Sequence, residues 1–145
     1  MASHCSTKYR TFQYASDALN RNSWLIAASN NSQNIGMATD SNPGTRWTTG
    51  QDQTENQWIE IDLSATSTFS TVELDSEGSS MNFPRLYTVE VSANGGNWTT
   101  VANGAGSDAT TTINFSEQEA RFVRIEQSGF SDRYWWSIHE INLFR

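Results

Sequence analysis

Short runs in which apolar and polar residues alternate recur along this chain, and they restrict its fold more than any other feature. In "QWIEIDL", for example, Ile59, Ile61 and Leu63 alternate with polar residues. Successive side chains of a β-strand point to opposite faces, so this pattern predicts a strand with one buried face. "FSTVELDS" and "LYTVEVSAN" repeat the pattern, whereas no run shows the periodicity of an amphipathic helix.

Eight predicted strands follow one another at the regular spacing of a β-sandwich or barrel. Polar turns separate them, among them "NGGNW", which predicts a hairpin turn because glycine tolerates a positive φ. We therefore expect an all-β fold in which two antiparallel sheets pack face to face. The predicted strands span residues 24–29, 57–63, 69–76, 86–94, 98–103, 110–115, 121–127 and 137–144.

The length of 145 residues is typical of one domain. No repeat, linker or low-complexity segment divides the chain, so we predict a single domain over residues 1–145 with its core sandwich at 24–144. Residues 1–23 are either a first edge strand with a loop or in part a cloning remnant. A chain of this size buries enough core to fold without disulfides, and its single cysteine, Cys5, has no internal partner.

The composition argues against nucleic acids and membranes as partners. The formal net charge is −7 and Lys8 is the only lysine, whereas nucleic-acid binders carry clustered positive charge. An acidic surface is repelled by anionic lipids, and no apolar run is long enough to span a bilayer. Six tryptophans in a chain with more than a third of Ser, Thr, Asn and Gln are typical of exported β proteins, so we expect a secreted protein. Because the first residues form no signal peptide, we expect a mature form or a piece of a longer protein.

The segment "DSNPGTRW", which begins at Asp40, offers several oxygen ligands in a tight turn. Asp40 and Thr45 carry side-chain oxygens, while Met37 and Asn42 can turn backbone carbonyls inward. Hard cations such as Ca²⁺ take six to eight oxygens of these kinds. Asp, Asn, Pro and Gly also build ordinary polar turns, so the segment by itself fits both interpretations. If the ends of the domain lie close together, Glu140 on the last predicted strand closes a cation cage.

Five sequence blocks, in order from about Trp24 to Phe144, resemble the discoidin or coagulation factor V/VIII C-type domain: "ATDSNPGTRWTTG", "QWIEIDL", "NFPRLYTVEVSANGGNW", "ARFVRIEQSG" and "WWSIHEINLF". Within that group they are most similar to the family 32 carbohydrate-binding modules attached to bacterial polysaccharide-degrading enzymes. The resemblance implies an eight-stranded jelly-roll β-sandwich with a structural Ca²⁺ near the C-terminal strand. The ligands it implies are the Met37 carbonyl, the Asp40 carboxylate, the Asn42 carbonyl, Thr45, the His139 carbonyl and Glu140.

A sugar site needs an aromatic plane for the C–H face of the ring and fixed polar groups for the hydroxyls. Arg46 with the following "TTGQDQTEN", the segment "FSDRYWW" and the segment "SEGSSMNF" offer both kinds of group. Adjacent strand residues face opposite sides, so we assign Trp136 to the core and Trp135 to solvent as the stacking platform. The resemblance places the ligand on loops at one end of the sandwich, and the residues we expect there are Arg46, Trp135, Tyr134, Gln51, Glu77, Asn30 and Asn31.

Structural roles compete with these assignments. Trp47 and Trp58 are expected to pack in or over the core, and Arg46 has Glu60 and Asp62 as alternative ion-pair partners. Asp75 and Glu77 are spaced to share one face of a strand, as a pair of glycosidase carboxylates would. A small module lacks the deep cleft for that chemistry, and no nucleophile, zinc or phosphate-loop motif is present. We therefore expect no enzymatic activity.

These features predict a non-catalytic, monomeric carbohydrate-binding module that brings a covalently attached polysaccharide-degrading enzyme to its substrate. Resemblance suggests chitosan, glucans or galactose-type sugars as ligands. Chitosan is attractive because its protonated amino group complements an acidic surface and Glu77. The alternative is a discoidin-type adhesion module for a cell-surface protein or lipid, although its relatives display apolar and basic loops and these loops are polar and acidic. A small hydrolase is a second alternative, for which no catalytic residues are identified.

Overall fold

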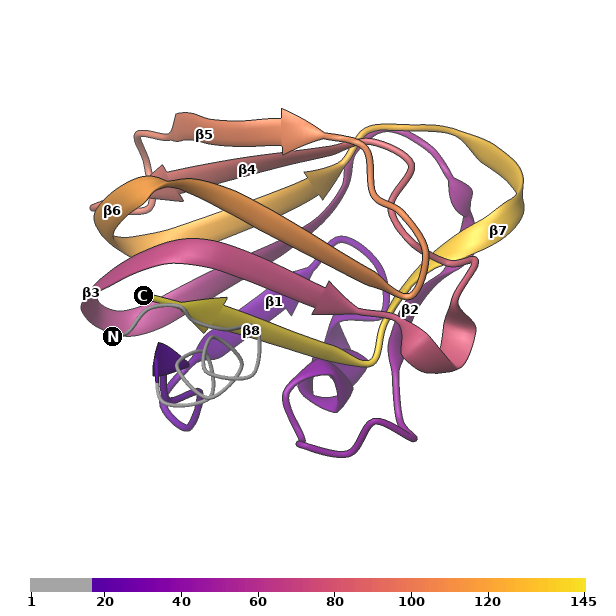
Figure 1. Cartoon of the computed structure of the whole chain (residues 1–145), viewed down its shortest axis with the longest axis horizontal. Helices are drawn as coiled ribbons and strands as arrows, with labels where there is room; N and C mark the ends of the chain where they lie inside the picture. Colours follow the sequence, from indigo (N-terminus) through magenta and orange to yellow (C-terminus); the bar gives the residue numbers. More distant parts are fainter. Residues whose placement is uncertain (1–16) are drawn as a thin grey trace, which may run out of the picture.

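The computed structural model describes residues 17–145, and strands dominate this part of the chain (Figure 1). The prediction of an all-β fold with eight antiparallel strands is confirmed, although several strand bounds differ. No helix among the described residues has both the length and the apolarity that crossing a membrane requires. The elements are β1 (Leu25–Ala28), η1 (Ser32–Ala38), β2 (Trp47–Gln53), β3 (Gln57–Asp75), η2 (Glu77–Ser79), β4 (Tyr87–Ser92), β5 (Thr99–Gly104), β6 (Thr110–Gln127), β7 (Ser131–Ile138) and β8 (Glu140–Phe144).

Two pairs of predicted strands are each one long strand in the structure. Strand β3 contains both 57–63 and 69–76, and β6 contains both 110–115 and 121–127. The two strands pair along nearly their whole length, with register shifts between Asp62 and Ser67 and between Phe69 and Thr71. Such irregularities bend a strand without ending its ladder, so each long strand contributes to both layers of the sandwich. The polar residues between the predicted strands therefore mark a bend and not a turn.

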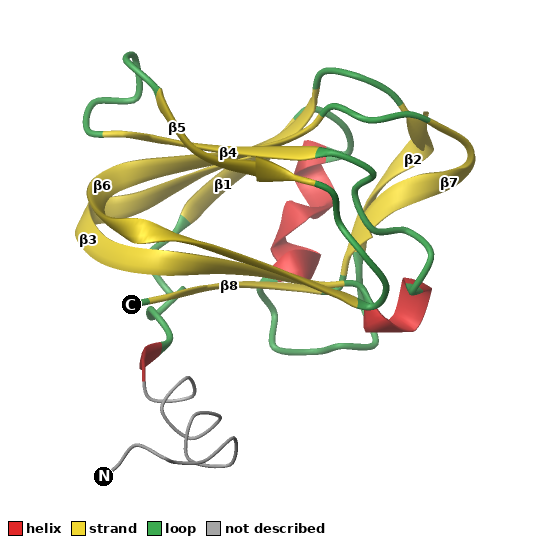
Figure 2. Cartoon of the chain, turned by 45° about the horizontal axis from the view of Figure 1, so that its top comes forward, coloured by secondary structure: helices red, strands yellow, loops and turns green. Residues whose placement is uncertain are grey.

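The larger sheet has the order β1-β3-β6-β4-β5, with β8 also paired to β3. Strands β2 and β7 form a separate two-stranded sheet, seen at one end of the molecule in Figure 2. The sequence did not predict β2, because "WTTGQDQ" is polar and its pairing is interrupted by register shifts. The last predicted strand is divided at His139, where β7 ends and β8 begins. The predicted hairpin between β4 and β5 is confirmed.

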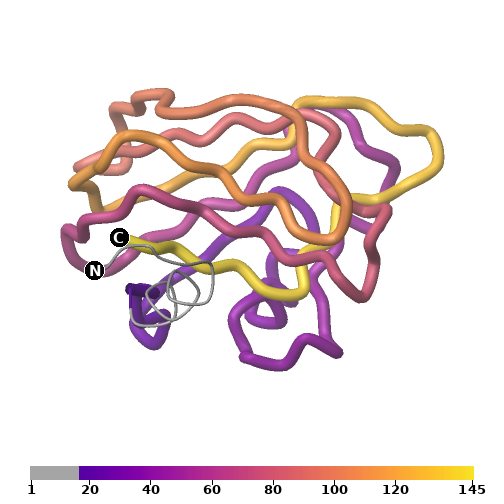
Figure 3. Tube along the Cα trace, in the orientation of Figure 1, coloured from indigo at the N-terminus to yellow at the C-terminus, as the bar shows by residue number. Residues whose placement is uncertain are grey.

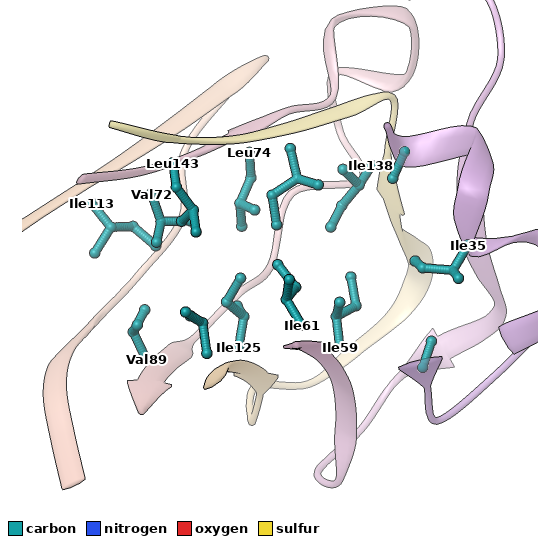
Figure 4. Packing of buried hydrophobic residues seen from close by; sticks show 14 of the residues in the cluster. Ile35, Ile59, Ile61, Val72, Leu74, Val89, Ile113, Ile125, Ile138 and Leu143 are labelled. Atoms are coloured by element: carbon teal, nitrogen blue, oxygen red, sulfur yellow. The ribbon is translucent and has the colours of Figure 1, made fainter. Parts of the chain in front are cut away.

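The core lies between the two layers, whose apolar side chains face each other in Figure 4. One layer supplies Val72 and Leu74 from the second half of β3, and the other supplies Ile59 and Ile61 from its first half. All the inward positions predicted from alternation in these segments are buried. At one end the buried Trp47 and Trp136 rings meet edge to face, with centroids 5.2 Å apart, and link β2 and β7 to the core.

The predicted first edge strand lies mostly outside the described residues. Of residues 1–23, only 17–23 are described, and Ala18 forms a single antiparallel bridge to Phe144 of β8. The backbone N–H of Leu19 donates to the Leu143 carbonyl at 2.9 Å. These contacts place the start of the described chain beside the C-terminal strand, where Arg21 reaches Glu140.

Candidate functional site

The cation loop, which we define as residues 37–45, connects the end of η1 to the segment before β2. It is held in shape by its own side chains. The backbone N–H of Asn42 donates to Asp40 Oδ1 at 3.0 Å, and the N–H of Gly44 donates to Asn42 Oδ1 at 2.9 Å. Short Asp and Asn side chains favour such turns because they bond the backbone two residues further on. Figure 3 shows the loop beside the junction of β7 and β8.

Several oxygens of the cation loop converge on the Thr45 hydroxyl. Thr45 Oγ1 lies 3.5 Å from the Met37 carbonyl oxygen and 3.0 Å from the Asn42 carbonyl oxygen, and it also contacts Asp40 Oδ2. A hydroxyl has one hydrogen and can donate it to only one of these three acceptors. A positive ion at the same place attracts all four oxygens, so this set of donors fits a hard cation.

Glu140 completes the set from the start of β8. Its Oε1 accepts from Arg21 Nη1 at 2.7 Å, while its Oε2 is buried and has no hydrogen-bond partner among the described residues. Burial raises the pKa of Glu140, Arg21 opposes this increase, and the neighbouring Asp40 carboxylate raises the pKa further. The hydrogen bond from Thr45 lowers the pKa of Asp40. A buried oxygen without a partner, beside a second carboxylate, is the feature expected of an anionic cation ligand.

His139, predicted as a ligand through its carbonyl, also has a buried imidazole ring with two polar partners. Its Nδ1 lies 2.7 Å from the Pro43 carbonyl oxygen, and its Nε2 lies 3.0 Å from Ser79 Oγ. Arg46 Nη1 donates to the same Ser79 Oγ at 2.7 Å. The ring therefore lies between the cation loop and the residue that holds Arg46.

The alternative ion pairs considered for Arg46 are wrong. Asp62 pairs with Arg121 at 2.8 Å, and Glu60 pairs with Arg124, its direct partner in the β3–β6 ladder, at 2.7 Å. Among the described residues, the Arg46 guanidinium bonds only Ser79. A guanidinium has five N–H donors, so four are left for a ligand.

The two adjacent tryptophans face opposite ways, as predicted. Trp136 is fully buried, whereas 40% of Trp135 is exposed. Trp135 pairs with Asp52 of β2, next to Gln51, in the irregular part of the β2–β7 sheet. Trp47 is buried in the core, as expected, and Trp58 is half-buried on the outer face of the large sheet. The exposed indole of Trp135 is therefore the one predicted platform with an accessible ring beside polar groups.

Glu77 and Gln51 are both exposed, from different elements. Glu77 begins η2, the short turn whose Ser79 accepts a hydrogen bond from Arg46. The notion that Asp75 and Glu77 share a strand face is wrong, because β3 ends at Asp75. Instead, Asp75 Oδ1 accepts from the Glu77 backbone N–H at 2.8 Å.

Asn30 and Asn31 have structural partners. The Asn31 amide donates to the carbonyl oxygens of Thr48 at 2.8 Å and Thr49 at 3.3 Å. The Asn30 carbonyl accepts from Trp47 Nε1 at 2.9 Å, and its side-chain oxygen accepts from the Ser29 hydroxyl. These bonds attach the segment after β1 to the first residues of β2.

Tyr134 lies against a cation that the sequence did not reveal. The Arg85 guanidinium carbon lies 3.9 Å from the centre of the Phe83 ring and 5.2 Å from that of Tyr134. Burial lowers the pKa of Arg85, although the side chain stays charged at neutral pH. The Tyr134 ring is thus engaged by Arg85, on the loop that follows η2.

The structure therefore places the predicted residues in two groups. Arg46 and the η2 residues form one group, before the start of β2, while Trp135 and Gln51 form the other, further along the β2–β7 sheet. Sequence reasoning missed Ser79, Arg21 and the role of the His139 ring. Each acts through a partner more than 30 positions away in the chain, and no local pattern marks such contacts.

The fold is an antiparallel β-sandwich in which the oxygen-rich loop at 37–45 lies beside β8 and the indole of Trp135 is exposed on β7. The family model of F5/8 type C domains described as "NedA-like, galactose-binding domain" matches residues 37–125. That match spans more than half of the chain, so the chain belongs to the F5/8 type C family, as the sequence blocks predicted. No curated protein matches the chain.

Solved carbohydrate-binding modules share this fold. Chitosan-binding module 2 of a chitosanase/glucanase from Paenibacillus sp. IK-5, solved with chitotriose, is 30% identical over 83% of this chain and 95% of its own, with a TM-score of 0.71. Module 1 of that enzyme is 26% identical over 83% and 94%, with a TM-score of 0.71. The family 32 module of Clostridium perfringens NanJ, solved with galactose, is 20% identical over 89% and 98%, with a TM-score of 0.76, and supports the fold alone.

Proposed function

We propose that this chain is a non-catalytic carbohydrate-binding module that holds chitosan or a related glucosamine polymer and keeps a covalently attached polysaccharide-degrading enzyme at its substrate. The observation that carries the proposal is its 30% identity, over 83% of this chain and 95% of the other, to a module solved with chitotriose. Such targeting takes place outside the cell, in keeping with the composition expected of a secreted protein.

The geometry supports the same function. Trp135 offers an exposed indole face for the C–H side of a pyranose, and Arg46 and Gln51 offer donors for its hydroxyls. Glu77 is an exposed carboxylate on η2, which complements a protonated amino group. A site made of surface side chains covers a small ligand area, so binding at one site is weak and several modules or sites strengthen it.

A structural Ca²⁺ belongs to this proposal. The Asp40 and Glu140 carboxylates, the Met37 and Asn42 carbonyls and the Thr45 hydroxyl would hold it, with the His139 carbonyl as a further ligand. Bound there, the ion supplies positive charge that offsets the two carboxylates and ties the loop to β8. Its role is to hold the loop next to Arg46, and the sugar contacts are made by side chains.

The test is calorimetric titration of the purified chain with chitotriose and with galactose. We expect chitotriose to bind and Trp135→Ala to weaken it by at least about tenfold, which corresponds to about 1.4 kcal/mol. Trp98→Ala is the matched control, because Trp98 is a half-buried indole that lies over Arg124 on the outer sheet face. Product analysis of the same mixtures should show no released sugar. Equal binding by wild type and Trp135→Ala would remove Trp135 from the site, and turnover would contradict the non-catalytic assignment.

A further inference from the structure

Three hydrogen bonds connect the cation loop to Arg46 through Ser79 and His139. Arg46 Nη1 lies 2.7 Å from Ser79 Oγ, Ser79 Oγ lies 3.0 Å from His139 Nε2, and His139 Nδ1 lies 2.7 Å from the Pro43 carbonyl oxygen. Residues 43, 46, 79 and 139 come from the cation loop, the start of β2, η2 and the β7–β8 junction. The connection therefore depends on the tertiary fold.

For a neutral His139 ring, the acceptors decide where the hydrogens of this connection lie. A carbonyl oxygen only accepts, so His139 Nδ1 carries a hydrogen and donates to Pro43. In the neutral ring Nε2 is then an acceptor, which the Ser79 hydroxyl satisfies as donor. The Ser79 oxygen still has lone pairs for the Arg46 N–H. Each donor has one acceptor, so the chain of bonds defines a single orientation for Arg46, Ser79 and the ring.

The ring itself is held in place. His139 is 5% exposed, and it packs against Gly78 of η2 so closely that a Cβ added at Gly78 would lie 2.5 Å from His139 Cε1. Real Cβ atoms do not come this near, so η2 reaches the ring only because residue 78 has no side chain. The backbone N–H of His139 also donates to the Asp75 carbonyl at 2.7 Å. The imidazole is thus held between the cation loop and η2 in one position.

We propose that Ser79 and His139 are positioning residues of the sugar site, which fix the Arg46 guanidinium relative to the cation loop so that its remaining N–H groups are set for a ligand. This inference rests on the proposed function, because it takes Arg46 as a sugar-binding residue. A free arginine side chain populates many rotamers and loses them on binding. Holding the Arg46 side chain in one conformation before the sugar binds reduces this loss of entropy and raises the affinity.

The first test is a double-mutant cycle measured by titration with chitotriose. Ser79→Ala should weaken binding by about three- to tenfold, the equivalent of one hydrogen bond. Ser79→Thr keeps the hydroxyl and should restore most of the affinity. In an Arg46→Ala background, Ser79→Ala should cause little further loss, because Ser79 acts through Arg46. Ser80→Ala, an exposed serine one position on, is the control and should bind as wild type does.

The second test needs no sugar. Nitrogen NMR at mildly alkaline pH should show the His139 ring in its Nδ1–H form. The order parameter of the Arg46 side-chain N–H groups should fall in Ser79→Ala and in Gly78→Ala. If the wild type binds no sugar, the proposed function is wrong. The NMR measurement still tests whether Ser79 and His139 hold Arg46. An Nε2–H ring, an unaltered Arg46 signal, or affinity losses that add in the double mutant would overturn the positioning roles.

Discussion

At the scale of single residues, Glu73 has the most unusual environment of the carboxylates that do not line the site. It lies on β3 between the buried Val72 and Leu74 and so points away from the core, opposite Thr112 of β6 and Asn142 of β8. Burial raises the pKa of Glu73 above its ordinary value of 4.5, and the charge of Asp75 raises it further. Folding therefore favours the neutral form of Glu73 relative to the unfolded chain.

We expect Glu73→Gln to raise the melting temperature at neutral pH. A carboxyl whose pKa is raised on folding contributes stability below its unfolded pKa and loses that contribution as the pH rises through the folded value. Glutamine has the same size and no charge, so the variant should be more stable by a few degrees at pH 7. The difference should vanish near pH 4. Thermal unfolding of both proteins across this range, with Glu119→Gln as an exposed control on β6, measures the effect; a variant less stable than wild type at pH 7 would contradict it.

At the scale of elements, the cation loop and β8 meet at a group of oxygen atoms in which hydrogen-bond acceptors outnumber donors. The Thr45 hydroxyl has three acceptors within reach but one hydrogen, and Glu140 Oε2 has no hydrogen-bond partner in the described part of the chain. Arg21 bonds both Glu140 and Ser41, so its cationic side chain bridges the loop and the strand. We expect such a loop to gain order if it binds a divalent ion.

Calcium should stabilise the wild-type chain, and Asp40→Asn should remove most of that effect. Binding to the folded state at a concentration about one hundred times the dissociation constant adds roughly 2.7 kcal/mol, or about 5–10 °C in melting temperature. Asparagine keeps the turn bond to Asn42 but not the charge. Asp132→Asn, an exposed residue of β7, is the control. Identical melting curves in calcium and in chelator would exclude this cation site.

At the scale of the whole molecule, the excess of acidic over basic residues gives a formal net charge of −7. Opposite charge attracts a protonated glucosamine polymer over distances set by the Debye length, about 8 Å at physiological ionic strength. A neutral galactose-type polymer feels no such attraction. We therefore expect the net charge to favour an amino-sugar polymer over a neutral galactose-type polymer.

Retention on chitosan should fall as salt increases, whereas retention on a neutral galactan, if there is any, should not. Glu77→Gln should weaken chitosan binding more than Glu117→Gln, although the two variants have the same net charge. The reason is that Glu77 lies on η2, whose Ser79 holds Arg46, whereas Glu117 is an exposed residue of β6. Affinity chromatography at two salt concentrations provides the measurement. Salt-independent retention, or equal loss in both variants, would argue against an amino-sugar ligand.

Much of this molecule follows from its sequence read locally. Alternation gave the buried faces of β3 and β4, because each side chain's own hydrophobicity and the two-residue period of a strand decide which face is buried. The same period correctly separated the exposed Trp135 from the buried Trp136. The short oxygen-rich turn around Asp40 was also visible, since turn residues act on their immediate neighbours.

What the sequence alone left open depends on contacts across the fold. Strand β2 is recognised only by its pairing with β7, and the fusion of predicted strands into β3 only by its continuous ladder with β6. The partners of Arg46 and Glu140 are Ser79 and Arg21, which lie 33 and 119 positions away along the chain. Local patterns determined which residues are buried, and the tertiary structure alone decided which polar groups meet, because a hydrogen bond needs two groups in place and the chain's path sets both.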